Sequence, residues 1–275
     1  MANPLRTDLR VMTGLGRRVG ALAPTRLGTA RNWLTTFSVW ASDRGWVRLR
    51  PWPRLRVAYC GRDVRIAVAS RSEVEVVNEM FCEEQYLVDG IGSPELILDL
   101  GSNVGASIIF FRARYPKARI IGFEPDPNAY QRLQASVAPL ENVEVYPFAI
   151  ADTTGSSAFH SSPQTWESAI IRDGAHGAGI IQVQTISIPD LMDRFHLSHV
   201  DLVKMDIEAG EWLVFDDPAA LARCETVIGE LHFDHPEHTA ERAQESLPDF
   251  EVTIASRSGT RANFVARRRA VSGSD

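Results

Sequence analysis

The sequence predicts an α/β protein in which a doubly wound, mostly parallel seven-stranded sheet carries helices on both faces, with a small N-terminal helical and hairpin extension. Two observations predict this fold. Short apolar runs alternate with helix-length segments and short loops from residue 95 onward, which is typical of a parallel sheet. The first run, Leu96–Leu100, ends at a Gly-x-x-x-Gly turn (residues 101–105), as the first strand of such a domain does before its first helix.

The N-terminal extension, residues 1–54, differs in composition from the rest of the chain. Residues 1–56 hold eleven arginines against two acidic residues, whereas the whole chain carries a net charge of −6. Apolar residues between Leu5 and Leu22 recur at helical spacing with arginines between them, which predicts an amphipathic helix. Such a helix either packs as a cap on the rest of the chain or contacts an anionic membrane or a partner.

Residues 55–94 predict a hairpin followed by a helix. Leu55–Ser70 alternates apolar and polar residues around a turn at residues 61–63. Ser72 and Glu75 form a plausible capping box for a helix that reaches Tyr86, and Gly90 begins a breaker that leads into the first core strand.

Residues 95–267 form the main domain, and residues 268–275 are expected to be a disordered tail. Pro127 favours a helix start and Asp126 is the better candidate for its cap. We expect strands at residues 96–100, 119–123, 143–146, 156–160, 180–184, 200–205, 226–231, 250–254 and 263–266, and helices at residues 105–114, 127–138, 189–195, 211–221 and 236–245.

Cysteine usage and hydropathy bear on the cellular compartment. Cys60, Cys82 and Cys224 are widely spaced and form no Cys-x-x-Cys pair, which indicates a reducing compartment. No apolar run approaches the roughly 20 residues of a membrane span, and the basic N-terminus lacks the apolar core of a signal peptide. We therefore expect a cytoplasmic protein, and a peripheral contact with the inner membrane face is compatible with the sequence.

The turn after the first strand indicates the kind of ligand. A dinucleotide fingerprint has Gly-x-Gly-x-x-Gly, but Asn103 stands where its second glycine would be, and Asp99 would repel a phosphate. A ligand with a cationic amine and no phosphate fits better, and S-adenosylmethionine is such a ligand. We expect Asp99 to face its amino group and Gly101 to allow its close approach.

The next two strand ends carry further candidate ligand contacts. Glu124 follows the second strand, where a carboxylate can accept hydrogen bonds from both hydroxyls of a ribose. Ala149 and Asp152 follow the third strand, where Ala149 would pack flat against an adenine and Asp152 would reach its amino group. The predicted cofactor contacts are Asp99, Gly101, Ser102, Asn103, Gly105, Glu124, Pro125, Ala149, Asp152 and Asp206.

The last two parallel strands end in candidate catalytic groups. Asp206 and Glu208 follow one strand, beside Lys204, and a carboxylate there can accept the proton of a hydroxyl. Glu230 and His232 end the next strand on one face, and a histidine in that cleft is a natural base. Asp206 and His232 remain alternatives for the base, with Glu208 and Glu230 orienting the acceptor. We expect no metal, because no third clear partner joins the two carboxylates.

Together these blocks resemble the FkbM family of S-adenosylmethionine-dependent methyltransferases. The resemblance rests on residues 97–105, 122–125, 201–211 and 230–232, and it covers roughly residues 55–266. The block Lys-Met-Asp-Ile-Glu at residues 204–208 makes it specific. It implies the Rossmann-like class I methyltransferase fold, S-adenosyl-L-methionine as cofactor, and methyl transfer to an oxygen, often a hydroxyl of a sugar or a secondary metabolite.

The expected partners follow from the same reasoning. The acceptor is a small molecule or glycan, with residues 161–179 predicted as its wall. No nucleic acid is expected, because an acidic cleft repels phosphates. A homodimer and a membrane or partner contact through residues 1–54 are compatible with the sequence. The alternatives are a nicotinamide-dependent oxidoreductase on the same sheet and a non-catalytic docking or scaffold protein.

Overall fold

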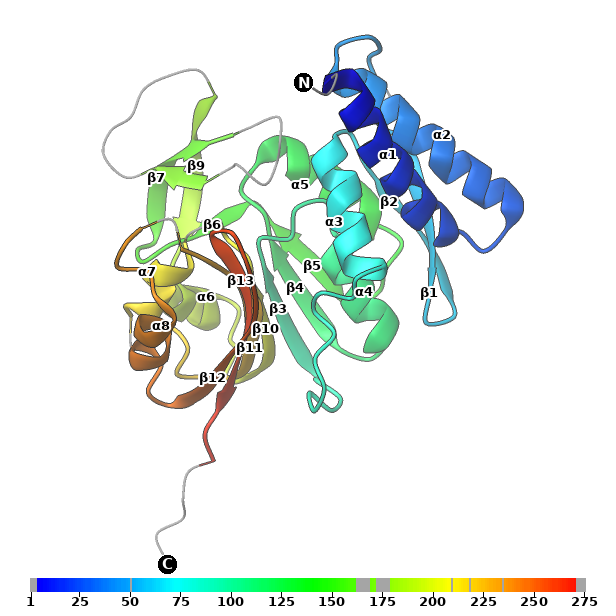
Figure 1. Ribbon diagram of the computed structural model, residues 1–275. Helices are drawn as coiled ribbons and strands as arrows, with labels where there is room; N and C mark the ends of the chain where they lie inside the picture. The colour runs from blue at the N-terminus through cyan, green and yellow to red at the C-terminus, as the bar shows by residue number, and fades with distance from the viewer. Residues whose placement is uncertain are drawn as a thin grey trace, which may run out of the picture.

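A seven-stranded sheet forms the centre of the molecule (Figure 1). The computed structural model describes residues 4–49, 51–161, 169–171, 179–208, 210–217, 219–233 and 235–270. The strand order is β12-β13-β11-β10-β3-β4-β5; the last five strands are parallel, and β13 and β12 join antiparallel. The strands are β3 (Leu96–Leu100), β4 (Arg119–Phe123), β5 (Val143–Tyr146), β10 (Val200–Met205), β11 (Cys224–His232), β12 (Phe250–Ser258) and β13 (Arg261–Arg268). This confirms the predicted fold class.

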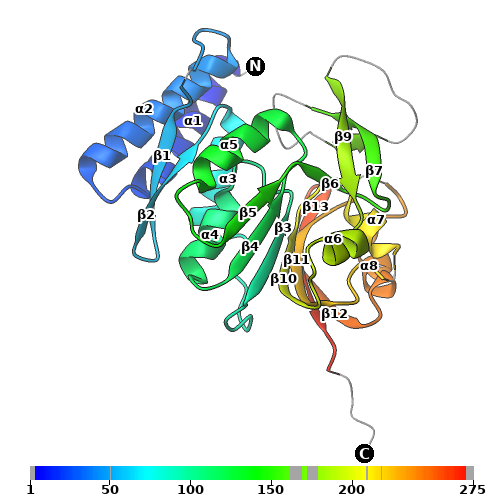
Figure 2. The ribbon, with the colours of Figure 1, turned by 180° about the vertical axis from the view of Figure 1, so that it is seen from behind.

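Helices cover both faces of this sheet (Figure 2). Alternating strand residues point to opposite faces: Ile97 and Ile120 join one apolar cluster, and Leu98 and Ile121 join the other. The first cluster is completed by α3 (Arg71–Phe81), α4 (Ala106–Arg114) and α5 (Pro127–Val137), and the second by α6 (Ile188–Arg194), α7 (Glu211–Phe215) and α8 (Ala240–Ser246).

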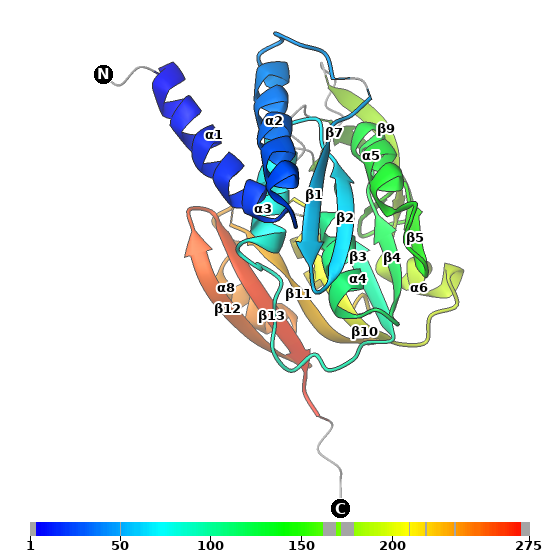
Figure 3. The same ribbon diagram turned by 90° about the vertical axis from the view of Figure 1, so that its right-hand side faces the viewer.

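The N-terminal residues form two helices and a hairpin at one end of the molecule (Figure 3). These are α1 (Pro4–Ala21), α2 (Arg26–Asp43), β1 (Arg54–Tyr59) and β2 (Arg62–Ala67). Met12, Leu15 and Val19 bury one face of α1 in the first apolar cluster, as their helical spacing predicts. α1 packs against α2 and α3. Among the described residues, no helix is long and apolar enough to cross a membrane.

A second, four-stranded sheet stands above the carboxyl ends of the main strands. Its order is β6-β9-β7-β8, with β6 (Phe148–Ile150), β7 (Gly155–His160), β8 (Ala169–Ile171) and β9 (Ile180–Ile186). The sequence predicted β7 and β9 as short strands but not their assembly into a sheet with β6, because three-residue strands carry almost no periodic signal.

Helix boundaries differ from expectation where a local cap or breaker decides. The cap of α3 is Ser70 and not Ser72, since the Ser70 side chain accepts from the Glu73 backbone N–H. α7 ends at Phe215 because Pro218 disfavours helical backbone just before it. α8 starts only after Thr239, which caps it. Asp126 caps α5 as predicted.

Candidate active site

A cavity of about 810 Å³, including its open mouth, lies at the carboxyl ends of β3, β4 and β10. This edge of the sheet is where ligands of open α/β sheets bind. α3 and the loop after it supply one wall through Glu79, Met80 and Tyr86, and β6 supplies another. The cavity therefore lies between the main sheet, the four-stranded sheet and α3.

The two glycines of the turn after β3 are required by packing within the chain. Gly101 has φ +80°, and a Cβ there would lie 1.9 Å from the backbone oxygen of Asp206. Gly105 has φ +88°, and its Cβ would lie 2.9 Å from Leu133 of α5. The sequence predicts that a ligand comes close to the backbone at Gly101. In the structure it is the backbone after β10, at Asp206, that comes close. Gly101 still lines the cavity, and Gly105 does not.

Asp99 lies behind the cavity wall and not in it. The strand register pairs it with Lys204 on β10, whose Nζ is 3.5 Å from Asp99 Oδ1. Ser107 donates a hydrogen bond to its other oxygen at 2.6 Å. Asp99 is fully buried and does not line the cavity, so the predicted contact with a ligand amine is not made from this position. Lys204 lines the cavity instead.

Lys204 is a buried cation held by oxygens on several sides. Its Nζ donates to the backbone oxygen of Gly101 at 2.6 Å and lies 3.8 Å from Asp206 Oδ2. Burial lowers its pKa, but the Asp99 and Asp206 carboxylates more than offset this, and the net pKa is raised. Its charge is therefore matched within the chain.

Glu124 sits at the end of β4 in the position that the sequence predicts for a ribose contact. Its Oε2 accepts from the backbone N–H of Asn103 and its Oε1 from that of Asp126, both at 2.8 Å. Burial raises the pKa of Glu124 to about 7. Each oxygen keeps a further lone pair, and the side chain lines the cavity. Ser102, whose Oγ accepts from the Phe123 backbone N–H, also lines it.

The predicted adenine wall is present in part. Pro125 and Ala149 line the cavity with the apolar side chains of Phe148, Ile150 and Phe159. Asp152 is exposed and does not line the cavity, so it does not reach a base bound there. It belongs to the turn between β6 and β7, which is the alternative that the sequence also allowed.

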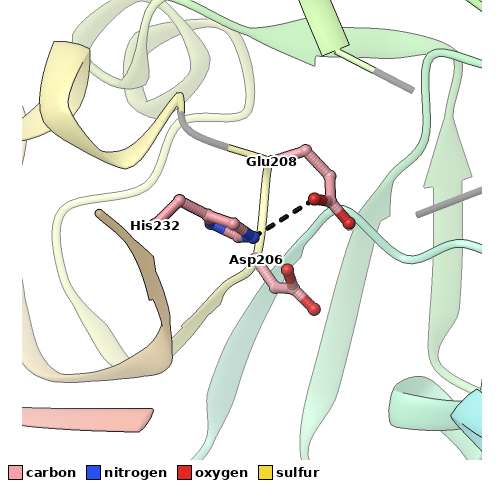
Figure 4. Close-up of side chains that lie close together, drawn as sticks. All are labelled: Asp206, Glu208 and His232. Atoms are coloured by element: carbon pink, nitrogen blue, oxygen red, sulfur yellow. Dashed lines mark ion pairs between the residues drawn. The ribbon is translucent and has the colours of Figure 1, made fainter. Parts of the chain in front are cut away.

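The four predicted catalytic residues gather at the ends of β10 and β11, and Figure 4 shows three of them: Asp206, Glu208 and His232. The Nε2 atom of His232 is 3.2 Å from Glu208 Oε2 and 3.6 Å from Glu230 Oε2. Asp206 and Glu208 line the cavity, whereas His232 and Glu230 do not. The four are neighbours, but only the two residues after β10 face the space that an acceptor would occupy.

The carboxylates around His232 raise its pKa. Burial lowers its pKa, but hydrogen bonding to the Glu208 and Glu211 carboxylates raises the pKa of His232 to about 11. Burial likewise raises the pKa of Glu208 and of Glu230. Arg261 of β13 lies 3.7 Å from Glu208 Oε2 and 3.5 Å from Glu230 Oε2. The His232 ring thus faces the carboxylates of Glu208 and Glu230, whereas Asp206 faces the cavity.

Glu211 is a functional neighbour whose role the sequence left unassigned. It is fully buried, its Oε1 accepts from the Ile207 backbone N–H at 2.9 Å, and its Oε2 lies 3.3 Å from His232 Nδ1. The next residue, Trp212, donates to the His232 backbone oxygen at 2.7 Å. The first turn of α7 thus holds His232 by both side chain and backbone.

Tyr86 and Glu79 also belong to the site, and sequence reasoning missed both. The Tyr86 hydroxyl donates to Asp206 Oδ2 at 3.1 Å. Burial, then the nearby Asp206 and Glu230 carboxylates, raise the pKa of Glu79 to about 8. More than 100 positions separate Tyr86 from Asp206, so no local pattern could have indicated the contact.

The ligand atoms of Asp206, Glu208 and His232 lie within 4.8 Å of one another, a grouping that could hold a metal ion. The third partner that the sequence lacked is therefore His232, and Arg261 already places positive charge beside Glu208. Residues 162–168 and 172–178, most of the predicted acceptor wall, lie outside the described residues.

A model of a known protein family matches the part of the chain that contains this site. The model of the methyltransferase FkbM domain matches residues 99–254. The chain belongs to the FkbM methyltransferase family. The matched segment starts at Asp99 and includes every predicted site residue, whereas the N-terminal helices and hairpin lie outside it.

Among relatives of this FkbM-family chain, AMB antimetabolite synthetase AmbE of Pseudomonas aeruginosa is 28% identical over 240 residues, covering 69% of this chain and 11% of AmbE. The 2-O-methyltransferase NoeI of Sinorhizobium fredii is 31% identical over 131 residues, covering 42% of this chain and 54% of NoeI. The chain thus spans about a tenth of one relative and about half of the other. A solved precorrin-6y C5,15-methyltransferase of Geobacter metallireducens is 13% identical, with a TM-score of 0.42 over 74% of this chain and 90% of that one.

Proposed function

We propose that this protein transfers a methyl group from S-adenosylmethionine to a hydroxyl group of a sugar, glycolipid or secondary metabolite. One observation carries the proposal: Glu124 and Asp206 line the same cavity, at the ends of β4 and β10, the two parallel strands on either side of β3. The Glu124 carboxylate can accept hydrogen bonds from the ribose of a nucleoside, and the Asp206 carboxylate can accept the proton of an acceptor hydroxyl. NoeI is a 2-O-methyltransferase and AmbE is an antimetabolite synthetase, which supports the choice of acceptor class.

The cavity fits the nucleoside of this cofactor. Glu124 is held rigidly by two backbone N–H groups and keeps lone pairs for two hydroxyls. Ala149 and Phe148 present an apolar surface on which a flat ring can pack. The contacts we propose for the cofactor are thus those of Gly101, Ser102, Asn103, Glu124, Pro125 and Ala149.

The charge of the cavity fits a cation. Asp206 and Glu208 line it, and Lys204, the lysine that lines it, faces the carboxylates of Asp99 and Asp206. Asp206 Oδ1 is buried and accepts no hydrogen bond from the described residues, and such an orphaned acceptor marks a place for a donor or a cation. When bound, S-adenosylmethionine supplies an electrophilic methyl group on a sulfonium cation.

The protein's own contribution is to position the acceptor and to accept its proton. Tyr86 donates to Asp206 Oδ2 and so orients the carboxylate towards the cavity. Asp206 then accepts the hydroxyl proton, with Glu208 orienting the acceptor. A general base typically contributes 10²–10⁴-fold, and positioning contributes the larger share.

We also place the protein in a reducing compartment such as the cytoplasm. Cys60 and Cys82 are exposed and free, and Cys224 is buried and free. Exposed free thiols persist where cellular thiols are kept reduced.

Thermal unfolding of the purified chain tests the proposal. S-adenosylhomocysteine at about 100 times its dissociation constant should stabilise the protein by about 2.7 kcal/mol, and NADH should have no effect. Stabilisation by NADH alone would favour an oxidoreductase, and stabilisation by neither would favour a scaffold; either result refutes the proposal. With S-adenosylmethionine, methyl transfer should occur to hydroxylated acceptors and not to their deoxy analogues.

A further inference from the structure

The outer face of α2 is an exposed apolar stripe outside the segment that matches the family. Leu27, Ala30, Leu34 and Phe37 are spaced by three and four residues, so they share one face of the helix. Leu27 is 71% exposed, Leu34 69% and Phe37 50%. The opposite face is buried through Thr36, Val39 and Trp40. An apolar stripe on the solvent side of a helix whose other face is already packed indicates a further contact surface.

Two further exposed apolar residues, Trp46 and Val47, follow the end of the helix, and Trp46 packs on the buried Trp40. The ring centroids of Phe37 and Trp40 are 5.2 Å apart, and those of Trp40 and Trp46 are also 5.2 Å apart. Trp46 is 63% exposed and Val47 is 44% exposed. Tryptophan at the border of an apolar surface is typical of groups that lie at a membrane–water boundary.

Arginines lie beside the stripe. A groove next to Leu27 and Leu34 is lined by Arg31 of α2, by Arg54 and Arg56 of β1, and by Arg65 of β2. Arg56 faces Asp63, but no acidic residue lines the groove. At about 100° per residue, Arg26 and Arg31 flank the stripe on its two sides. The surface is therefore apolar at its apex and basic at its margins.

From this surface we infer that the α2 face docks on an anionic lipid bilayer. Leu27, Leu34 and Phe37 enter the boundary between headgroups and acyl chains, and the arginines face lipid phosphates. A helix with an apolar face and flanking basic residues binds anionic membranes through burial of the apolar face and through attraction of the basic residues to anionic lipids. The exposed apolar apex favours a lipid surface over a nucleic acid, which would leave the stripe in water.

Docking in this way has a consequence for the cavity. α2 packs directly on α3, and α3 supplies Glu79 and Met80 to the cavity wall. In Figures 1 and 3 the α1–α2 pair covers the same end of the molecule as α3. A bilayer bound at α2 would therefore be separated from the cavity wall by a single layer of helices.

Co-sedimentation of the full-length chain with vesicles tests the inference. The wild type should bind vesicles of phosphatidylcholine mixed with phosphatidylglycerol, bind poorly to phosphatidylcholine alone, and be released by salt. The double variant Leu34→Ser with Phe37→Ser should bind about tenfold or more weakly, because it loses the apolar contact. The double variant Arg54→Gln with Arg65→Gln should bind about 25-fold more weakly, at about fivefold per arginine.

Matched controls separate these effects from a general loss of structure. Leu87 is an exposed apolar residue outside the stripe, and Lys117 is an exposed basic residue in the loop between α4 and β4. Leu87→Ser and Lys117→Gln should bind vesicles like the wild type. Because every substituted side chain is exposed, circular dichroism and unfolding temperature should be unchanged in all variants.

Two results would overturn the inference. One is equal sedimentation with anionic and neutral vesicles, or none with either. The other is light scattering that shows a dimer in the wild type and a monomer in the Leu34→Ser and Phe37→Ser double variant, since the stripe would then be an interface between two copies of the chain.

Discussion

The replacement Asp206→Asn tests the assignment of the base directly. Asp206 follows β10, its side chain is 28% exposed, and its Oδ2 accepts the Tyr86 hydroxyl at 3.1 Å. Asparagine has the same shape and can still accept that hydrogen bond, but it carries no charge and takes up no proton. The substitution therefore removes the basic group while leaving the local packing unchanged.

The expected size of the effect follows from the role. Loss of a general base lowers the rate of the chemical step by about 10²–10⁴-fold. The affinity for S-adenosylhomocysteine should change by less than about fivefold, because that ligand lacks the sulfonium charge and a partly exposed ion pair is worth about 1 kcal/mol or less. The variant should thus lose kcat and keep its binding, a separation that damage to the fold would not produce.

Two further variants complete the assay, which measures turnover at saturating S-adenosylmethionine and ligand binding by calorimetry. Tyr86→Phe keeps the carboxylate and removes only its donor, so its kcat should fall by about tenfold. His232→Asn should lower the unfolding temperature, because it leaves Glu211 and Glu208 without their shared cation. If Asp206→Asn retains turnover within tenfold while a folded His232→Asn is inactive, the assignment to Asp206 is wrong.

Three other predictions concern binding and stability. The affinity for S-adenosylhomocysteine should fall by up to about tenfold per pH unit as the pH drops below about 7, because the pKa of Glu124 is raised to about 7 and only its ionised form accepts both ribose hydroxyls. Calorimetry across that pH range measures this affinity. The variant Glu124→Gln should abolish the pH dependence. Arg132→Met should cost about 3–5 kcal/mol of unfolding free energy by stranding the buried carboxylate of Glu73, and adding Glu73→Gln should restore much of it in denaturant titrations. Gly101→Ala should lower the free energy of unfolding by more than about 3 kcal/mol, because its Cβ would lie 1.9 Å from a backbone oxygen. Gly90 has a similar φ but open space around it, so Gly90→Ala should lower the free energy of unfolding by only about 1–2 kcal/mol in the same denaturant titration.

The parts of the fold that the sequence predicted are those coded by local patterns. The apolar run Leu96–Leu100, the cap Asp126 and the alternation on both sides of residues 61–63 each report the conformation of their own neighbourhood. α2 was missed for a physical reason of the same kind. Its exposed face carries Leu34 and Phe37, so the helix lacks the polar stripe by which a surface helix is normally detected.

The parts of the site that could not be predicted depend on which strands are neighbours. Asp99 seemed available to a ligand because the sequence does not say that Lys204 is its partner in the register of β3 and β10. Tyr86 could not be placed beside Asp206 without the packing of α3 over the strand ends. The raised pKa of His232, which hydrogen bonding to acidic residues causes, likewise depends on contacts from distant parts of the chain.

The distribution of charge around the ends of β10 and β11 separates the acidic residues into two kinds. Glu208 and Glu230 face positive groups of the chain itself, since His232 and Arg261 both lie within 3.7 Å of one of their oxygens. These two carboxylates are therefore largely neutralised and fixed in place. Asp206 has a buried oxygen that accepts no hydrogen bond from the described residues. Lys204 lies 3.8 Å from the other oxygen of Asp206, so what Oδ1 lacks is a hydrogen-bond donor. An acceptor hydroxyl would supply that donor, which is why we propose Asp206 for the chemistry and the others for support.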